Sequence, residues 1–263
     1  MVFYTKSRFS GERIIKLGFN MMKPDELANL ARQKQDLEKS KIEDIIRRRN
    51  LNKLYHFTSM ENFKSIIRHG IAGKNFLTKN GIEFQITDNS SLQFLKDAIF
   101  FSLSNPNDYM RYTKRMSGMK LIVAEISELS SIIEIFCEVP FVATPTNSSN
   151  LQIQKLFGSN PELFLGYTGL KNLFQKESVR ELFALDLKEP TDPQSEIIFL
   201  QKLPSHFITR WHVPVRYYEA FVDLNGDYIN VHKDFKMSQF DSYDGKKARE
   251  QRDFRSWDIT WIS

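Results

Sequence analysis

The stretch LYHFTSMENFKSIIRHG, residues 54–70, predicts a strand that turns directly into a helix. Its first four residues are mostly apolar or aromatic, as in a short strand. Thr58 is a residue type that caps helix N-termini, and Glu61 stands three residues later, where a capping-box partner belongs. Gly70 suits the position just after a helix, because glycine adopts the left-handed conformation at little cost. This β-turn-α unit would place the ring of His56 at the mouth between strand and helix.

The remaining pattern favours a mixed α+β domain. Strands are expected at Ala98–Leu103, Leu121–Ile126, Ile132–Val139, Glu196–Leu200, Trp211–Tyr218 and Tyr228–Val231, and helices near Asn150–Phe157 and Gly169–Leu182. These strands cluster and do not alternate regularly with helices, so a doubly wound parallel sheet is disfavoured. We find no internal repeat and no low-complexity tract.

Residues 1–50 are expected to form a helical N-terminal extension, followed by a main domain over residues 51–210. Pro24 suits the first turn of a helix, and the arginines at 47–49 suit its C-terminal end, where the helix dipole favours cations. The apolar stripe of this helix is incomplete and consists of Leu27, Leu30, Leu37, Ile42 and Ile45. Such a helix is either half exposed or docked on another surface.

Residues 211–263 form an aromatic and basic C-terminal segment, which we expect to pack on the same domain. Aromatic residues from Trp211 to Tyr243 are followed by cations and two tryptophans between Lys246 and Trp261. Aromatic rings interleaved with cations suit stacking on single-stranded bases and contacts with phosphates. They suit equally an ordinary core whose surrounding cations cover it with their stems.

Composition limits the class of protein. With 263 residues, of which 41% are hydrophobic, the chain can bury a core without disulfides or metals. The single cysteine excludes an internal disulfide framework, and neither a signal-peptide run nor an apolar stretch of about 18 residues is found. We therefore expect a soluble cytoplasmic protein without a membrane partner. The net charge of +5 and the pI of about 9.1 suit a polyanionic partner, but also an ordinary solvated surface.

Common catalytic motifs do not occur in the sequence. A P-loop, a GxSxG elbow, an HExxH pair and a GxGxxG turn are all absent. No metal is expected, because the five histidines show no ligand spacing; they are His56, His69, His206, His212 and His232. Cys137 lies in an apolar run and is expected to be a buried thiol rather than a nucleophile.

Three separated pieces carry the candidate chemistry. The first contains His56, whose imidazole suits a hydrogen bond to a ribose hydroxyl or an amide, or else a purely structural one. The second, SLSNPNDYM at residues 102–110, is either a strand-ending turn or a place where Tyr109 stacks on a flat heterocycle. In the third, TDPQSE at residues 191–196 precedes an apolar strand. Glu196 would either face a cleft and polarise a ribose hydroxyl or be hydrated at the strand end.

In their order and spacing, the pieces YHFT-x3-N, SLSNPNDYM and PTDPQSEIIF resemble the DarT family of DNA ADP-ribosyltransferases, and its guanine-modifying branch more than its thymidine-modifying one. The resemblance covers residues 53–210. It implies an ADP-ribosyltransferase fold, in which two antiparallel sheets splay around an NAD cleft with flanking helices. NAD would be the co-substrate, and no metal would take part.

The same resemblance implies roles for individual residues. His56 and Thr58 would hold the nicotinamide riboside end of NAD, with Asn62 beside them. Tyr109 would lie near the nicotinamide or the acceptor. Glu196 would be the catalytic carboxylate.

One departure from the family concerns an arginine, which the family carries in a segment like YRFDG before the second piece. Here residues 91–97 read SLQFLKD. The role would fall to Lys96, Arg111 or Arg115. The two arginines are also candidates for contacting the acceptor, together with Gln194, which resembles the acceptor-facing residue of a Q-x-E motif.

The resemblance implies a toxin that transfers ADP-ribose from NAD to a base of single-stranded nucleic acid, either DNA or mRNA, in phage defence or a toxin–antitoxin system. A cognate antitoxin or a chaperone would then engage residues 1–50, where the helix would offer Leu27, Leu30 and Leu37 to a partner groove, or the segment after residue 210. Two alternatives stay open. One is a catalytically dead relative that only binds nucleic acid or a partner protein, and the other is a transferase that modifies protein side chains.

Overall fold

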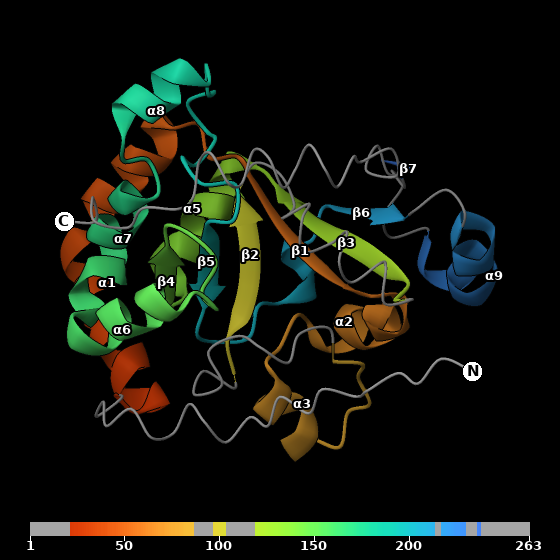
Figure 1. Ribbon diagram of the computed structural model, residues 1–263. Coiled ribbons are helices and arrows are strands. Elements are labelled where there is room, and N and C mark those ends of the chain that lie inside the picture. The colour runs from red at the N-terminus through yellow and green to blue at the C-terminus, as the bar shows by residue number, and fades with distance from the viewer. Residues whose placement is uncertain (1–21, 87–96, 104–118, 214–216, 230–235, 238–263) are drawn as a thin grey trace, which may run out of the picture.

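The computed structural model describes residues 22–86, 97–103, 119–213, 217–229 and 236–237 (Figure 1). The strands are β1 (Lys53–Ser59), β2 (Ile99–Leu103), β3 (Leu121–Ser127), β4 (Phe141–Thr144), β5 (Glu196–Phe199), β6 (Arg210–Val213) and β7 (Lys236–Met237). The α-helices are α1 (Pro24–Arg48), α2 (Phe63–His69), α3 (Lys74–Lys79), α5 (Leu129–Glu138), α6 (Leu151–Ser159), α7 (Gly166–Asn172), α8 (Glu177–Leu182) and α9 (Tyr218–Ile229). Short 3-10 turns are η2 (Met60–Asn62), η3 (Pro161–Phe164) and η4 (Ser205–Phe207). This mixture confirms the predicted α+β class.

The described strands form one sheet in the order β4-β5-β2-β1-β3-β6-β7. All neighbours are antiparallel except β6 and β7. β1 pairs with β3 along its whole length, but it pairs with β2 only where Leu54 and Tyr55 face Leu103 and Ser102. Beyond Tyr55 the two strands run apart, as Figure 1 shows for β1 and β2. We call this divergence the split.

The split explains how the implied pair of splayed sheets relates to the observed sheet. One arm consists of β4, β5 and β2, and the other consists of β1, β3, β6 and β7. The short ladder at Leu54 and Tyr55 joins the arms, so hydrogen bonding is continuous and the described strands count as one sheet rather than two.

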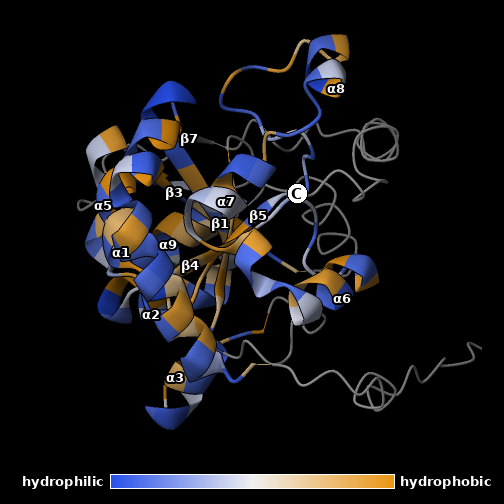
Figure 2. Ribbon diagram, turned by 90° about the vertical axis from the view of Figure 1, so that its left-hand side faces the viewer, coloured by the Kyte–Doolittle hydropathy of each residue, from blue (hydrophilic) through white to orange (hydrophobic). Residues whose placement is uncertain are grey.

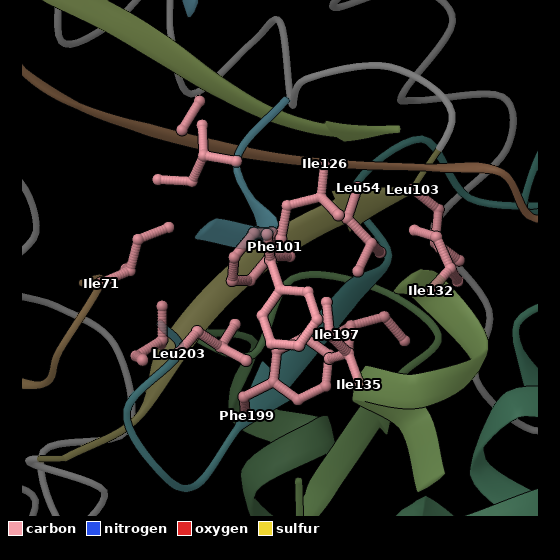
Figure 3. Close-up of a cluster of buried hydrophobic side chains, with 14 of the residues drawn as sticks. Leu54, Ile71, Phe101, Leu103, Ile126, Ile132, Ile135, Ile197, Phe199 and Leu203 are labelled. Atoms are coloured by element: carbon pink, nitrogen blue, oxygen red, sulfur yellow. The ribbon is translucent and has the colours of Figure 1, made fainter. Parts of the chain in front are cut away.

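Apolar side chains fill both faces of the sheet, because successive residues of a strand point to opposite sides. On the first face, Phe101 and Phe199 pack with Ile135 of α5 (Figure 3). On the second face, Val142 and Ile198 pack against α1 and α6. Figure 2 shows the result as mostly apolar strands inside a shell of helices with mixed surfaces.

Helix α1 takes part in this packing and confirms the helix expected from Pro24. It contacts α5, α7 and β4. Its side chains Leu27, Ile42 and Ile46 have no exposed surface, so the expectation that Leu27 is offered to a partner is wrong. Leu37 is 83% exposed. The amide of Gln35 donates to the Val139 carbonyl at 3.2 Å and thereby ties α1 to the end of α5.

Two strands predicted from the sequence are wrong. The run Ile132–Val139 lies largely in the helix α5, because its buried residues Ile132, Ile135 and Phe136 recur with the 3.6-residue helical period. Residues 228–229 of the other belong to α9, whereas residues 230–231 lie outside the described chain. The strand β4 was not expected.

Other boundaries differ locally. The predicted strand Trp211–Tyr218 ends at Val213, and Tyr218 begins α9. The helix expected over Gly169–Leu182 is broken into α7 and α8 at Lys176, whose φ is 63°. The predicted helix near Asn150–Phe157 is confirmed as α6, which Asn150 caps by accepting a bond from the Gln152 amide.

The β-turn-α unit at residues 54–70 is confirmed except for its cap. Thr58 lies inside β1, and the helix begins only after η2, so Thr58 is not an N-cap. Gly70 does end α2, with φ at 77°. A Cβ at this position would lie 2.2 Å from the Leu203 carbonyl oxygen, so the bridge between Ile71 and Leu203 requires glycine here.

The described part of the C-terminal segment contributes to the core. Trp211 and Phe221 are fully buried, and the Phe63 ring meets both of them edge to face. These two aromatic residues therefore match the ordinary-core alternative. Residues 238–263 lie outside the described chain. In the part that is described, no helix combines the length and apolar character needed to cross a membrane.

Candidate active site

Glu196 opens β5, which β2 separates from the split. Its Cα partners are Ser102 on β2 and Thr144 on β4, and directly paired residues point to the same side of a sheet. The side chain is only 6% exposed, and its Oε2 accepts a hydrogen bond from the Ser148 backbone N–H at 2.8 Å. The carboxylate is therefore not the hydrated strand-end group that was the alternative reading.

The loop before Glu196 is held by its own hydrogen bonds. The Thr191 amide donates to the Leu173 carbonyl at 2.8 Å, and the Ser195 hydroxyl donates to the Pro145 carbonyl at 2.9 Å. The Gln194 backbone N–H donates to Asp192 Oδ1 at 2.7 Å. These bonds fix the backbone on both sides of Gln194, whose side chain is half-buried. A fixed loop suits a residue that positions an acceptor.

His56 lies at the split. Its Nδ1 is 2.9 Å from the carbonyl oxygen of Phe100, so the ring bridges β1 and β2 just where their ladder ends. The ring also packs at 5.4 Å from Phe101. Burial lowers the pKa of His56, although the bond to Phe100 acts in the opposite direction. A neutral imidazole that donates from Nδ1 presents a lone pair at Nε2, which suits a hydroxyl donor such as a ribose.

The register separates His56 from Glu196. Tyr55, not His56, lies in the row of Ser102 and Glu196 across the sheet. Alternation along β1 directs His56 to the opposite face, and β1 and β5 are two strands apart. One ligand would contact both residues only by passing through the split, where no ladder closes the sheet.

The structure brings Thr58 and Asn62 together, but the hydrogen bonds of their side chains are made to each other and to the backbone of Gln85. Asn62 Nδ2 donates to the Thr58 hydroxyl at 3.0 Å and to the Gln85 carbonyl at 2.8 Å, while its Oδ1 accepts from the Gln85 amide at 2.6 Å. Both side chains are buried. Asn62 therefore clamps the backbone at Gln85 to β1. Contact of Thr58 and Asn62 with NAD stays a prediction.

A second polar cluster, not anticipated from the sequence, continues the same row on the other arm. Glu125 is opposite Tyr55, is 1% exposed, and binds His212 Nε2 at 2.6 Å and Lys53 Nζ at 3.2 Å. Burial alone would raise the pKa of Glu125, but His212 and Lys53 outweigh it and lower the pKa to about 2. Burial, and then the charge of Glu125, raise the pKa of Tyr55. This cluster ties β1, β3 and β6 together.

The remaining candidates fall into two groups. Tyr109, Arg111 and Arg115, like Lys96, lie outside the described residues. Cys137 is buried as expected, and burial raises the pKa of its thiol. Within the ranges that the structure describes, no three His, Cys, Asp or Glu side chains gather as a metal site would require.

Ser102 is a neighbour of Glu196 that was not expected from the sequence. It is the Cα partner of both Tyr55 and Glu196, and it is 4% exposed. Its position at the head of SLSNPNDYM was visible in the sequence, but only the strand register shows that it stands beside Glu196.

Comparison with known proteins gave structural similarities alone. Neither a scan against protein-family models nor a search of curated proteins found a match. DarT from Thermus sp. 2.9 in complex with ADP-ribosylated single-stranded DNA has 15% identity and a TM-score of 0.47, over 74% of this chain and 97% of that one. The same protein with NAD+ has 16% identity and a TM-score of 0.42, over 68% and 90%. DarTG from Thermosipho africanus with ADP-ribose has 12% identity and a TM-score of 0.45, over 71% and 48%. The solved structures found by this comparison are DarT proteins, the family that the motifs of this chain resemble.

Proposed function

We propose that this protein is an NAD-dependent ADP-ribosyltransferase that modifies a base of single-stranded nucleic acid. The observation that carries the proposal is the carboxylate of Glu196, which is buried in the same row as Ser102 and Tyr55, the last paired residues before the split, and is held by the Ser148 backbone N–H. Perturbed or buried carboxylates at such positions are candidates for catalysis rather than for surface solvation. The reaction type is inferred from the motifs around Glu196 and His56, which resemble those of the DarT family.

The proposed reaction begins with cleavage of the glycosidic bond of NAD, which resembles the hydrolysis of a glycoside. The bond between nicotinamide and C1′ of the ribose breaks, and its electron pair neutralises the pyridinium nitrogen of the leaving nicotinamide. Positive charge develops on the ribose, and a fixed carboxylate such as Glu196 stabilises it. A base nitrogen then attacks C1′ and passes its proton to the Glu196 carboxylate. His56 would accept a hydrogen bond from a ribose hydroxyl at Nε2, and Gln194 would orient the acceptor.

The biological setting belongs to the same proposal. We infer a toxin in phage defence or a toxin–antitoxin system, restrained by an antitoxin or a chaperone, because unrestrained base modification harms the cell. A partner that engages residues 1–50 would contact the outer surface of α1 around Leu37, since Leu27 is buried. The acceptor is either DNA or mRNA.

Offering one labelled NAD pool to separate acceptors tests the proposal. The purified protein is incubated with NAD labelled in the adenylate and with single-stranded DNA, single-stranded RNA or protein, and the label on each acceptor is measured. We expect label on a nucleic acid and none with Glu196→Gln. Label only on protein would support transfer to side chains. No label on any acceptor, with no nicotinamide released, would support the catalytically dead alternative.

A further inference from the structure

Two buried hydroxyl groups beside Glu196 lack a hydrogen-bond partner among the described residues. Thr144 has no exposed surface and Ser148 is 1% exposed. Neither the Thr144 Oγ1 nor the Ser148 Oγ has a hydrogen-bond partner within the described part of the chain. Buried polar groups nearly always find partners, so a pair of exceptions at one place requires an explanation.

The position of these hydroxyls points to one shared neighbour. Thr144 is the Cα partner of Glu196 across β4 and β5, which puts the two side chains on the same face with Cβ atoms about 5 Å apart. Ser148 already donates its backbone N–H to Glu196 Oε2 at 2.8 Å. Both orphaned hydroxyls therefore belong to residues that adjoin one carboxylate.

The carboxylate has capacity for these donors. An ionised carboxylate offers about four lone-pair sites, and a hydroxyl rotates freely to direct its hydrogen. Hydrogen bonds to an ionised acceptor are roughly twice as strong as neutral ones, so the energy of such a bond would offset the cost of a small side-chain rotation. The backbone is fixed here because the Ser195 hydroxyl binds the Pro145 carbonyl at 2.9 Å, which leaves side-chain rotation as the available movement.

We propose that Thr144 and Ser148 are positioning residues, whose hydroxyls donate to the Glu196 carboxylate when NAD occupies the site and hold it against the ribose. The hydroxyls have no partner within the described part of the free protein and would gain one in the loaded protein. This inference rests on the proposed function, because it assigns these residues to the same carboxylate.

The test exploits the opposite effects expected on stability and catalysis. Thr144→Val keeps the shape and removes the hydroxyl, so the melting temperature should stay unchanged or rise. The rate constant kcat for nicotinamide release from NAD, measured with single-stranded DNA and RNA oligonucleotides present, should fall about tenfold or more. The KM for NAD should change less than about twofold, because the hydroxyl contacts the carboxylate and not NAD.

Three further variants separate positioning from folding. Thr144→Ser restores a hydroxyl and should recover most of kcat, and Ser148→Ala, which keeps the backbone donor, should lower kcat in the same way as Thr144→Val. Thr209→Val is the matched control, because its hydroxyl is satisfied by the Ser127 amide at 2.9 Å and lies on the other arm of the sheet. This control should lower the melting temperature and leave kcat unchanged.

Different outcomes test the positioning inference and the proposed function separately. Full kcat in the Thr144→Val and Ser148→Ala double variant overturns the positioning inference and leaves the proposed function intact. A fall in kcat that follows a fall in melting temperature, with no recovery in Thr144→Ser, shows a structural role and also overturns it. A wild-type protein that releases no nicotinamide from NAD overturns the proposed function, and the inference with it.

Discussion

Replacing Glu196 by glutamine is expected to abolish ADP-ribose transfer while the protein stays folded. The replacement keeps the length and shape of the side chain, so no cavity opens at the start of β5. The amide oxygen of glutamine can accept the hydrogen bond that Ser148 now donates to Glu196 Oε2 at 2.8 Å. We therefore expect the free energy of unfolding to change by less than about 1 kcal/mol.

The catalytic loss is expected to be much larger than the loss of stability. Glutamine has no charge with which to stabilise the positive ribose, and groups that stabilise transition-state charge contribute about 3–4 kcal/mol each. This corresponds to a fall in rate of about 10²–10³-fold. The burial of Glu196, at 6% exposure, favours the upper part of this range because water screens the charge little.

Glu125 provides the matched control, since it is the other buried carboxylate of the same row. Its pKa of about 2, against a usual 4.5, shows that the folded state favours its charge. At 1.36 kcal/mol per pKa unit, and discounting for the 41% exposed Lys53, Glu125→Gln should destabilise the fold by roughly 2–3 kcal/mol. Its transfer rate at low temperature should stay near that of the wild type.

The measurement is label transfer from NAD at saturating acceptor, together with urea unfolding of both variants. A well-folded Glu196→Gln protein with transfer within about threefold of the wild type would remove Glu196 from the mechanism. Equal losses of transfer in both variants would show that the assay reports folding and not the carboxylate.

Three further predictions use the same protein. His56→Ala should weaken NAD binding by about 0.5–1.5 kcal/mol in calorimetry, as for one hydrogen bond to a neutral group. Unchanged affinity with a much lower melting temperature would show that His56 has a structural role only. Because the pKa of Glu125 is lowered from 4.5 to about 2, its stabilisation is present above pH 4.5 and lost as the pH falls toward 2. The melting temperature should therefore fall more steeply in this window for the wild type than for Glu125→Gln, and parallel curves would contradict the assignment. Finally, single strands should be modified faster than duplexes, because extruding a stacked base costs a few kcal/mol, and rates should fall with salt; equal rates on both would place the acceptor elsewhere.

The sequence predicted those elements whose signals are local. Pro24 marked the start of α1, Gly70 marked the end of α2, and the polar loop before an apolar run marked the start of β5 at Glu196. The main error was the strand predicted for Ile132–Val139, most of which belongs to α5. This run is apolar at nearly every position, so it resembles a buried strand unless the 3.6-residue spacing of its buried residues is recognised.

The site could be predicted only in part, because much of it depends on strand register. The neighbours of Glu196 on β2 and β4 come from chain positions far from residue 196, and no local pattern specifies that pairing. The cluster of Glu125, His212 and Lys53 was missed for the same reason. Thr58 was assigned a capping role from a short motif that the longer strand β1 overrides.

The split connects the fold to the proposed chemistry. A sheet normally satisfies its backbone groups by pairing, but β1 and β2 stop pairing after Tyr55, and the His56 ring binds the Phe100 carbonyl at this place instead. The bond fixes the tautomer that leaves Nε2 as an acceptor. The short ladder that ends at Tyr55 places the row of one arm, which ends at Tyr55, next to the row of the other, which contains Ser102 and Glu196. A ligand seated at the split would therefore bind both arms at once, so NAD binding should stabilise their relative position as well as place the ribose beside Glu196.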